Sequence, residues 1–410
     1  MSASPGRVVV LDENLSVPFD RRVWHEARAL SRAGFEVDVV CPQGTERDRE
    51  PFELREGVRI HRFPAVSANG GAASYAREYG SATWHMSRLL RKLTRERPFD
   101  LVHACNPPDF LLLVAWPLKR RGARFLFDHH DLVPELYLSR FDRGKDVLYR
   151  VTRGLERATF RLADVVIATN ESYRRIALTR GRKRPEDVFV VRSAPDLTRF
   201  RATDPDPALK RGRRYLLAYL GTMGPQDGVD HAVHALAALR RRRDDWRAVF
   251  VGGGEMLEAM RRLARELGLH DVVEFTGRVS DEEVVSVLST ADVCLAPDPK
   301  SPLNDVSTMT KVVEYMAMAR PIVSYDLAES RVSAGDAAIY ARADDVGSFA
   351  ACIDALLDDP ERRAAMAAEA SARIEGLSWA NSERALLAAY ERALSKSAES
   401  EVSFSLGSSQ

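Results

Sequence analysis

A lysine and a glutamate three residues apart, Lys311 and Glu314, stand near the start of an expected helix, shortly after Ser307, Thr308 and Thr310. Residues at this spacing share one face of a helix, and hydroxyl side chains are favoured helix caps. A cation beside the free N–H groups of a helix start suits a diphosphate, and a carboxylate can accept hydrogen bonds from both hydroxyls of a ribose. The ordinary alternative is an exposed ion pair, which would contribute little to stability.

Glycine-rich turns follow two expected strands, 215–220 and 246–251, in the second half of the chain. The turn residues concerned are Gly221, Thr222, Met223, Gly224, Gly253 and Gly254. Glycine lets a backbone approach a phosphate closely, although an ordinary tight turn also uses it, and neither segment is a GxGxxG or Walker sequence. Arg278 follows a third strand, 272–276, and its loop is expected at the same edge of the sheet, where ligands of such sheets bind.

In the first half of the chain, His130 and Asp131 directly follow the expected strand 124–128. This places them at the carboxyl edge of a parallel sheet. A histidine can hydrogen-bond sugar or acceptor hydroxyls without acting as a base, and Asp131 is a candidate base for activating an acceptor. The alternative is a hydrogen-bonded pair that closes a turn.

Three segments carry a resemblance to a known family. Residues 307–317, STMTKVVEYMA, resemble the donor-binding element of retaining glycosyltransferases of family 4, which have the GT-B fold, in the subgroup that reads roughly STxxKxxEYMAxxxP. Residues 19–27, FDRRVWHEA, resemble that subgroup's N-terminal loop and helix, and residues 127–135, FDHHDLVPE, resemble its first-domain active-site loop. The resemblance spans nearly the whole chain. It implies two Rossmann-like doubly wound α/β domains that face each other across a cleft.

The resemblance also implies roles for individual residues. Glu314 corresponds to the ribose ligand, Lys311 with the turn 221–224 to the diphosphate contacts, and His130 to a contact with the donor sugar. Asn304 and Asp305 would lie near that sugar. The family's commoner pattern has a glutamate eight residues before the ribose ligand, where this chain has Val306, and Asp305 is a candidate substitute.

The implied activity is retaining transfer of a sugar from a nucleoside diphosphate sugar, with UDP as the expected nucleotide, to a hydroxyl acceptor on the leaving-group face. Glycan, exopolysaccharide or glycoconjugate biosynthesis is the expected context. No cofactor or metal is expected, because the one Asp-x-Asp segment, Asp204-Pro205-Asp206, lies in a proline-rich stretch. Two alternatives stay open: a sugar-nucleotide epimerase or hydrolase of the same fold, and a non-catalytic sugar-nucleotide-binding partner.

Composition narrows the class of protein further. The 410 residues include 60 basic and 59 acidic side chains, a balance that gives no reason to expect nucleic acid as a partner. The four cysteines lack metal-ligand or disulfide spacing, and no signal peptide or membrane-spanning run is visible, so a cytoplasmic location is expected. The basic runs 119–121 and 240–243 are ordinarily solvated helix ends, and the alternative is a patch that contacts anionic lipid or an anionic acceptor. Peripheral contact with the inner face of a membrane and a lipid-linked acceptor are the corresponding expectations.

Short β-branched runs alternate with amphipathic stretches, which predicts parallel sheets covered by helices. The expected strands are 7–11, 36–41, 58–62, 101–104, 124–128, 165–169, 189–191, 215–220, 246–251, 272–276, 293–296, 321–324 and 338–340. The expected domains are an acceptor-side domain at 1–193, a linker at 194–213, a donor-nucleotide domain at 214–378, a helix at 379–395 that crosses back, and a disordered tail at 396–410.

Overall fold

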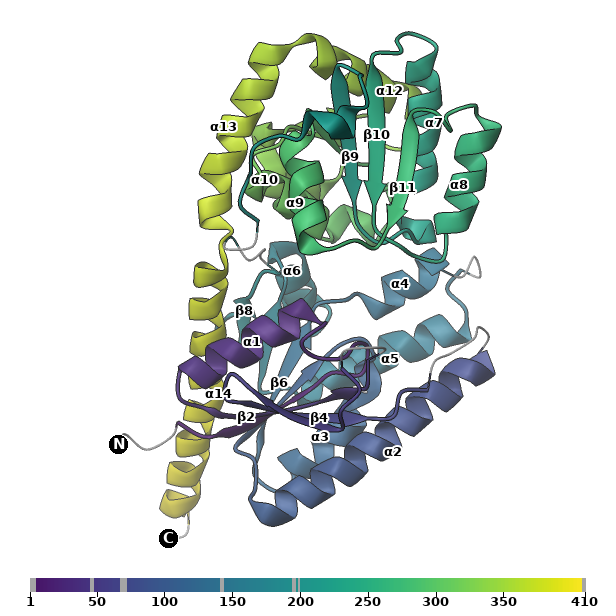
Figure 1. The fold of residues 1–410 in the computed structure, drawn as a ribbon. Coiled ribbons are helices and arrows are strands. Elements are labelled where there is room, and N and C mark those ends of the chain that lie inside the picture. Colours follow the sequence, from purple (N-terminus) through teal and green to yellow (C-terminus); the bar gives the residue numbers. More distant parts are fainter. Residues whose placement is uncertain are drawn as a thin grey trace. The chain divides into compact units, whose positions relative to one another are not determined.

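Each half of the chain forms a parallel sheet in the computed structural model, which describes residues 5–44, 48–66, 72–140, 144–193, 197 and 200–407. The chain divides into two units. The first comprises Met1–Arg192 together with Ser382–Gln410, and the second comprises Ser193–Asn381. Figure 1 shows both units, with helices packed on both faces of each sheet. The two sheets have the doubly wound, Rossmann-like arrangement that the sequence predicts.

The sheet of the first unit has eight strands in the order β3-β4-β2-β1-β5-β6-β7-β8. Its strands are β1 (Arg7–Leu11), β2 (Glu36–Pro42), β3 (Phe52–Arg55), β4 (Val58–Phe63), β5 (Leu101–Cys105), β6 (Arg124–His129), β7 (Val165–Ala168) and β8 (Val188–Val190). Every pairing is parallel except that of β3 with β4. The direction of the strand order reverses at the β1–β5 neighbour pair, which is the place where ligands of such sheets bind.

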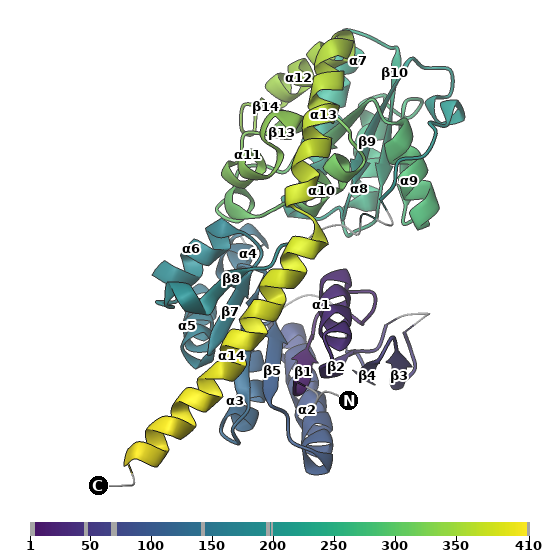
Figure 2. The same ribbon diagram turned by 90° about the vertical axis from the view of Figure 1, so that its left-hand side faces the viewer.

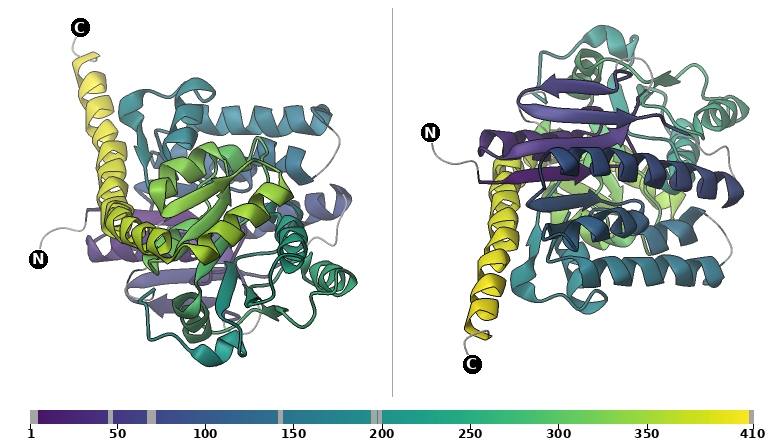
Figure 3. Two further views of the ribbon diagram at one scale, coloured as in Figure 1. Left: turned by 90° about the horizontal axis from the view of Figure 1, so that it is seen from above. Right: turned by 90° about the horizontal axis from the view of Figure 1, so that it is seen from below.

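Helices cover both faces of this first sheet. They are α1 (Arg21–Arg32), α2 (Ala72–Glu96), α3 (Leu112–Lys119), α4 (Val133–Arg140), α5 (Val147–Leu162), α6 (Glu171–Thr179) and most of α14 (Trp379–Gly407). Apolar residues of α2, α3 and α5 share one core cluster with the strands, and the three helices lie side by side in the right-hand panel of Figure 3. On the opposite face, His103 of β5 reaches α14, where its Nδ1 atom lies 2.9 Å from the Tyr390 hydroxyl. Figure 2 shows α14 running along this unit.

The sheet of the second unit has six parallel strands in the order β11-β10-β9-β12-β13-β14. They are β9 (Tyr215–Leu220), β10 (Trp246–Val251), β11 (Val273–Gly277), β12 (Val293–Ala296), β13 (Ile322–Tyr325) and β14 (Ala338–Ala341). The strand order reverses between β9 and β12, so the loops that follow these two strands form the expected ligand edge. The turn with Gly221 follows β9, the turn with Gly253 follows β10, and the segment with Lys311 comes after β12.

Two helix layers enclose the second sheet. One core cluster joins it to α7 (Val229–Arg240), α8 (Leu257–Glu266) and α12 (Val346–Asp358), and another joins it to α9 (Asp281–Thr290), α10 (Thr310–Ala317) and α13 (Pro360–Gly376). The short α11 (Ala328–Ala334) follows β13. Successive residues of β9 alternate between the clusters, since Leu217 joins the first and Leu216 the second. This alternation follows from the two-residue repeat of a strand that is buried on both faces.

Two segments differ from the sequence prediction. Part of the expected linker is held against α9, because the Thr203 amide donates to Ser289 Oγ at 3.0 Å and the Asp206 amide donates to Thr290 Oγ1 at 2.8 Å. Residues 194–196, 198 and 199 of that linker lie outside the described residues. The expected disordered tail continues as helix α14 to Gly407, because the sequence has no glycine or proline between Trp379 and Leu406 to end the helix.

Candidate active site

The two glycine turns of the second unit pack directly against each other. A Cβ atom on Gly252 would lie 1.9 Å from the Gly221 carbonyl oxygen, and one on Gly254 would lie 2.5 Å from the Met223 carbonyl oxygen. The buried Met223 has both backbone groups engaged: its amide donates to the Gly253 carbonyl at 2.9 Å and its carbonyl accepts from the Met256 amide at 2.9 Å. Gly254 and Met223, predicted as ligand contacts, therefore have a structural role in joining the turns.

The Gly221 turn packs closely against Lys311 and Tyr219. Gly221 has φ 153°, and a Cβ atom there would lie 3.2 Å from Lys311 Cε and 3.2 Å from the Tyr219 hydroxyl oxygen. The next two predicted residues close the turn: the Thr222 carbonyl accepts from the Tyr219 hydroxyl at 2.7 Å, and the Gly224 amide donates to Asp227 Oδ2 at 2.9 Å. The structure thus brings together Lys311 and the first glycine turn, the two segments that the family resemblance paired.

Lys311 is held at this position by buried charge. Its Nζ atom lies 2.5 Å from Asp298 Oδ1 and 3.9 Å from Asp227 Oδ1, and its side chain is 7% exposed. Although burial opposes the charge, the carboxylate of Asp298 raises the pKa of Lys311, so the ammonium group stays protonated. An ammonium group has three N–H donors, and the salt bridge with Asp298 uses one of them.

Tyr315 fixes α10 at the point where the strand order reverses. Its hydroxyl accepts from the Leu220 amide of β9 at 2.8 Å and donates to the Leu295 carbonyl of β12 at 3.1 Å. The start of α10, with Lys311, is thereby tied to both strands. Glu314 follows three residues later on this helix and is partly exposed. Arg278, which follows β11, lies over the second turn: a Cβ atom on Gly253 would be 3.5 Å from Arg278 Cγ.

Asn304 and its neighbours are engaged in holding loops together. The Asn304 amide group donates to the carbonyls of Gln226 and Pro299, both at 2.9 Å, and the residue is 4% exposed. Asp305 Oδ1 accepts from the Ala328 amide at 3.0 Å. Thr308 donates its hydroxyl to Glu329 Oε1 at 3.1 Å. Both amide hydrogens of Asn304 bind carbonyl oxygens that join the loops after β9 and β12, so only its Oδ1 atom is left to contact a sugar, and the expected position near the donor sugar stays a prediction.

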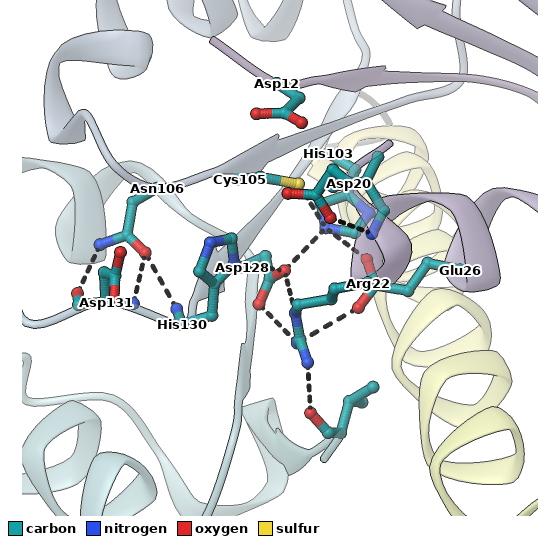
Figure 4. A network of polar contacts seen from close by, with 12 residues as sticks. Asp12, Asp20, Arg22, Glu26, His103, Cys105, Asn106, Asp128, His130 and Asp131 are labelled. Atoms are coloured by element: carbon teal, nitrogen blue, oxygen red, sulfur yellow. Dashed lines mark hydrogen bonds and ion pairs between the residues drawn. The ribbon is translucent and has the colours of Figure 1, made fainter. Parts of the chain in front are cut away.

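In the first unit, Asn106 shapes the turn that carries His130 and Asp131. Its Oδ1 atom accepts from the His130 amide at 2.9 Å and the Asp131 amide at 3.0 Å, and its Nδ2 group donates to the Asp131 carbonyl at 2.7 Å. Asn106 directly follows β5, whereas His130 directly follows the neighbouring β6. Figure 4 shows these contacts. Sequence reasoning missed Asn106, although its position just after a strand is the same signal that identified His130.

His130 is part of a buried charge network that includes α1. Its Nδ1 atom donates to Asp128 Oδ2 at 3.0 Å, and Arg22 binds both oxygens of Asp128 at 2.7 Å (Figure 4). Although burial would raise the pKa of Asp128, the charges of Arg22 and His130 hold it well below its usual range. Burial would also lower the pKa of His130, but Asp128 raises it to about 9. His130 is therefore a cation at neutral pH, and it can donate a hydrogen bond but cannot accept a proton.

Four buried side chains behind His130 have atoms that could bind a metal: Glu26, His103, Cys105 and Asp128 offer ligand atoms within 4.8 Å of one another. Arg22 already occupies this cluster as a cation, at 2.7 Å from Asp128 Oδ1 and 3.2 Å from Glu26 Oε1. Burial raises the pKa of Glu26 to about 8 and lowers that of His103 to about 4, so both are uncharged at neutral pH. The cluster is thus neutralised by Arg22 and has no unpaired carboxylate charge to attract a metal ion.

Comparison with known proteins covers both units. Residues 20–194 match the family model described as glycosyl transferase 4-like domain, and residues 214–359 match the model described as glycosyl transferases group 1. The chain is 27% identical to a D-inositol 3-phosphate glycosyltransferase of Kineococcus radiotolerans, over 90% of this chain and 88% of that protein. It is 32% identical, over 66% of each chain, to a GDP-mannose-dependent alpha-(1-6)-phosphatidylinositol monomannoside mannosyltransferase of Mycobacterium tuberculosis.

Solved structures share the fold at low sequence identity. Sucrose-phosphate synthase of Thermosynechococcus elongatus matches with a TM-score of 0.78 and 17% identity, over 95% of this chain and 99% of that chain. HepE of Anabaena, solved in complex with UDP-glucose, matches with a TM-score of 0.67 and 17% identity, over 93% and 98% of the two chains. These likenesses establish the two-domain architecture of this chain.

Proposed function

The chain belongs to the family-4 glycosyltransferases of GT-B fold, and on this basis we propose that it transfers a sugar from a nucleoside diphosphate sugar to a hydroxyl acceptor with retention of anomeric configuration. The observation that carries the proposal is the position of Lys311. Its buried ammonium group lies at the reversal of strand order, beside the Gly221 turn. A fixed cation at this edge is suited to a diphosphate.

The proposed reaction is a single substitution at the anomeric carbon. The acceptor oxygen forms a bond to this carbon while the bond from the carbon to the diphosphate breaks, and the acceptor proton passes to the departing diphosphate. Negative charge grows on that leaving group, so catalysis requires groups that stabilise it more in the transition state than in the substrate. Lys311 and the N–H groups at the start of α10 would supply this stabilisation without a metal ion.

His130 would serve as a hydrogen-bond donor to the donor sugar. This role is supported by the protonation state of His130: because Asp128 raises its pKa to about 9, the imidazole keeps its proton at neutral pH. A protonated imidazole cannot act as general base, and this leaves Asp131 as the nearby candidate for orienting the acceptor hydroxyl. Glu314, one helical turn after Lys311, would accept hydrogen bonds from the ribose. Arg278 and Gly253 would flank the nucleotide at the next loop of the same edge.

We propose UDP as the donor nucleotide. HepE, which shares the fold, was solved with UDP-glucose, but the mannosyltransferase of Mycobacterium tuberculosis is named for GDP-mannose. A thermal-shift or calorimetric screen of UDP, GDP and ADP and their sugars tests this choice. Tight binding of one nucleotide, lost in a Lys311→Met variant, is the expected result. If no nucleoside diphosphate bound, the proposed function would fail.

The acceptor is proposed to be lipid-linked and reached at a membrane surface. In the described part of the chain, no helix has both the length and the apolar character needed to span a bilayer. Two tryptophans are exposed on the contacting helices α2 and α3, Trp84 at 56% and Trp116 at 48%. Arg88 lies over the first ring at 5.6 Å and Arg120 over the second at 5.1 Å. Exposed tryptophan with arginine suits the interface of an anionic bilayer.

Incubation with a labelled donor distinguishes transfer from the two alternative functions. Transfer predicts a labelled product only when acceptor is added. An epimerase or hydrolase would convert the donor without acceptor. A non-catalytic binding partner would bind the donor but leave it unchanged, including in a cell extract that supplies acceptors.

A further inference from the structure

A basic cavity in the first unit is lined by the C-terminal half of α5 and the turn after α6. Its volume is about 350 Å³, and its cationic lining residues are Arg157, Arg161, Arg180, Arg182 and Lys183. The volume lies within the usual range of ligand sites, about 300–1,000 Å³. Arg157 and Arg161 belong to α5, and Arg180, Arg182 and Lys183 follow α6, whereas His130 directly follows β6 and Lys311 lies at the start of α10 in the other unit. The proposed transfer reaction assigns no role to this cavity.

The backbone on one side of the cavity is tightly constrained. A Cβ atom on Gly181 would lie 2.6 Å from the Ala177 carbonyl oxygen and 2.7 Å from Phe160 Cγ, so the turn after α6 is pressed against the Phe160 ring. Arg182, the next residue, has φ 54°, a left-handed conformation that is rare for a bulky side chain. The buried Phe160 and this turn form a rigid part of the cavity lining.

Folding accounts for two of the five cations. Lys183 donates to the Ala163 carbonyl at 2.6 Å, next to the end of α5, where the helix dipole favours a cation. Arg180 binds Glu135 Oε1 at 2.6 Å and also pairs with Glu156. Both contacts are expected of a stable helix end and require no ligand.

The other three cations are less well explained: Arg161 lies in the last turn of α5, where the helix dipole favours a cation, but in the described part of the fold no contact accounts for Arg157 and Arg182. Arg157, Arg161 and Arg182 are exposed, and no carboxylate among the described residues pairs with them. Arg157 and Arg161 are four residues apart on α5, a spacing at which like charges destabilise a helix by a few tenths of a kcal/mol. Three guanidinium groups without carboxylate partners give this cavity a positive electrostatic potential, which a bound anion would neutralise.

We infer that this cavity binds a phosphate group. Guanidinium groups bind phosphate oxygens through two parallel hydrogen bonds, and three of them around one concave site can surround a phosphate monoester or diphosphate. The phosphate comes from one of two sources: a soluble phosphorylated compound or the phosphate of a lipid headgroup. The chemistry at the cavity is the same for both, and it is separate from the diphosphate of the donor.

The test compares two double variants of the full-length protein. Arg157→Ala/Arg161→Ala removes two cations from the cavity, and Arg150→Ala/Arg175→Ala removes two exposed cations from the same helices outside it. Both variants carry the same change in net charge. Thermal melting checks that each is folded.

The soluble arm uses inorganic pyrophosphate, with binding followed by hydrogen–deuterium exchange. Protection of peptides that cover residues 157–161 and 180–183 is expected, at sites distinct from the donor turn at 221–228. The cavity variant should need about tenfold more pyrophosphate for this protection, whereas the control variant should resemble the wild type. An equal loss in both variants would show a long-range charge effect only and would overturn the proposal.

The lipid arm uses vesicles of phosphatidylglycerol and phosphatidylcholine, with phosphatidylcholine alone as reference. Protection of the same peptides by the anionic vesicles, lost in the cavity variant and kept in the control, would identify the lipid phosphate as the source. Absence of protection in both arms would refute a phosphate site at this cavity.

Discussion

The Nδ1 atom of His130 lies 3.0 Å from Oδ2 of Asp128, and both oxygens of that carboxylate are also bound by Arg22. Asp128 is fully buried and lies between two cations. Arg22 comes from α1 and His130 from the loop after β6, so the carboxylate joins two segments that are far apart in the sequence. This arrangement makes His130 a fixed hydrogen-bond donor.

The first prediction concerns pH. The pKa of His130 is raised to about 9, so kcat/KM should be flat near neutral pH and fall as the pH rises through about 9. His130→Gln should lower kcat by about 100-fold, the usual loss for a donor that acts in the transition state, and should remove this alkaline limb. An alkaline limb unchanged in His130→Gln would assign it to another group.

The same shift also links His130 to stability. The folded pKa lies above the unfolded value of about 6.5, so the stabilisation is complete below that value and is lost as the pH rises toward 9. The melting temperature of the wild type should therefore fall more between pH 7 and 9.5 than that of His130→Gln. Parallel decreases in the two proteins would contradict the assigned pKa.

The second prediction separates the two roles of Lys311. Lys311→Met should weaken nucleoside diphosphate binding by about 10- to 100-fold, since hydrogen bonds to charged groups contribute about 1.5–3 kcal/mol. It should also destabilise the fold by about 3–5 kcal/mol, because Asp298, which is 2% exposed, loses its partner. Adding Asp298→Asn should restore the melting temperature but not the binding. Recovery of nucleotide binding in the double variant would show that Lys311 acts only on the fold.

The framework of both sheets was readable from the sequence. Strands such as β1 and β10 coincide with predicted runs because their residues are all buried and, apart from Arg7 and Arg247, apolar. The pairing of Lys311 with the Gly221 turn was implied by the family resemblance, whereas the strand-edge rule placed the two glycine turns and the Arg278 loop at one edge. By contrast, β3 was missed because it is a short antiparallel edge strand whose Phe52 and Leu54 are exposed.

The charge network could not be read from the sequence for a physical reason. Arg22 and Asp128 are 106 residues apart, and their pairing depends on how α1 packs beside β6. The contacts of the Asn304 amide group with two loop carbonyls could not be read from the sequence for the same reason, because they depend on how the loops after β9 and β12 meet. Asp298 offered a readable signal, since it lies in the Pro-Asp-Pro turn that directly follows β12.

The third prediction tests the contact between Glu314 and the ribose. The wild type should bind a ribonucleoside diphosphate about tenfold more tightly than its 2′,3′-dideoxy analogue, because a carboxylate accepts hydrogen bonds from both hydroxyls. In Glu314→Gln this preference should shrink to less than about twofold. The exposed Glu282→Gln, on α9 of the same unit, serves as control and should keep the preference. Equal preference in wild type and Glu314→Gln would place the ribose elsewhere.

The fourth prediction concerns metal ions. Lys311 and the start of α10 are proposed to neutralise the diphosphate, and Arg22 neutralises the buried cluster around Asp128. Activity in excess EDTA should therefore equal that in added Mg²⁺ or Mn²⁺ within about twofold, as expected when a protein cation replaces a metal. Loss of activity in EDTA, restored by Mn²⁺, would overturn the metal-free mechanism.

The fifth prediction tests the proposed membrane surface. The wild type should co-sediment with vesicles that contain phosphatidylglycerol, and Trp84→Ala/Trp116→Ala should reduce this binding by about tenfold, because each ring would leave the bilayer interface. The matched control is Phe52→Ala/Leu54→Ala, which removes two other apolar side chains, exposed at 53% and 66% on β3. Binding by the wild type should weaken in high salt, since arginines lie beside both rings. If the control variant lost as much binding as the tryptophan variant, the effect would come from general surface hydrophobicity and not from α2 and α3.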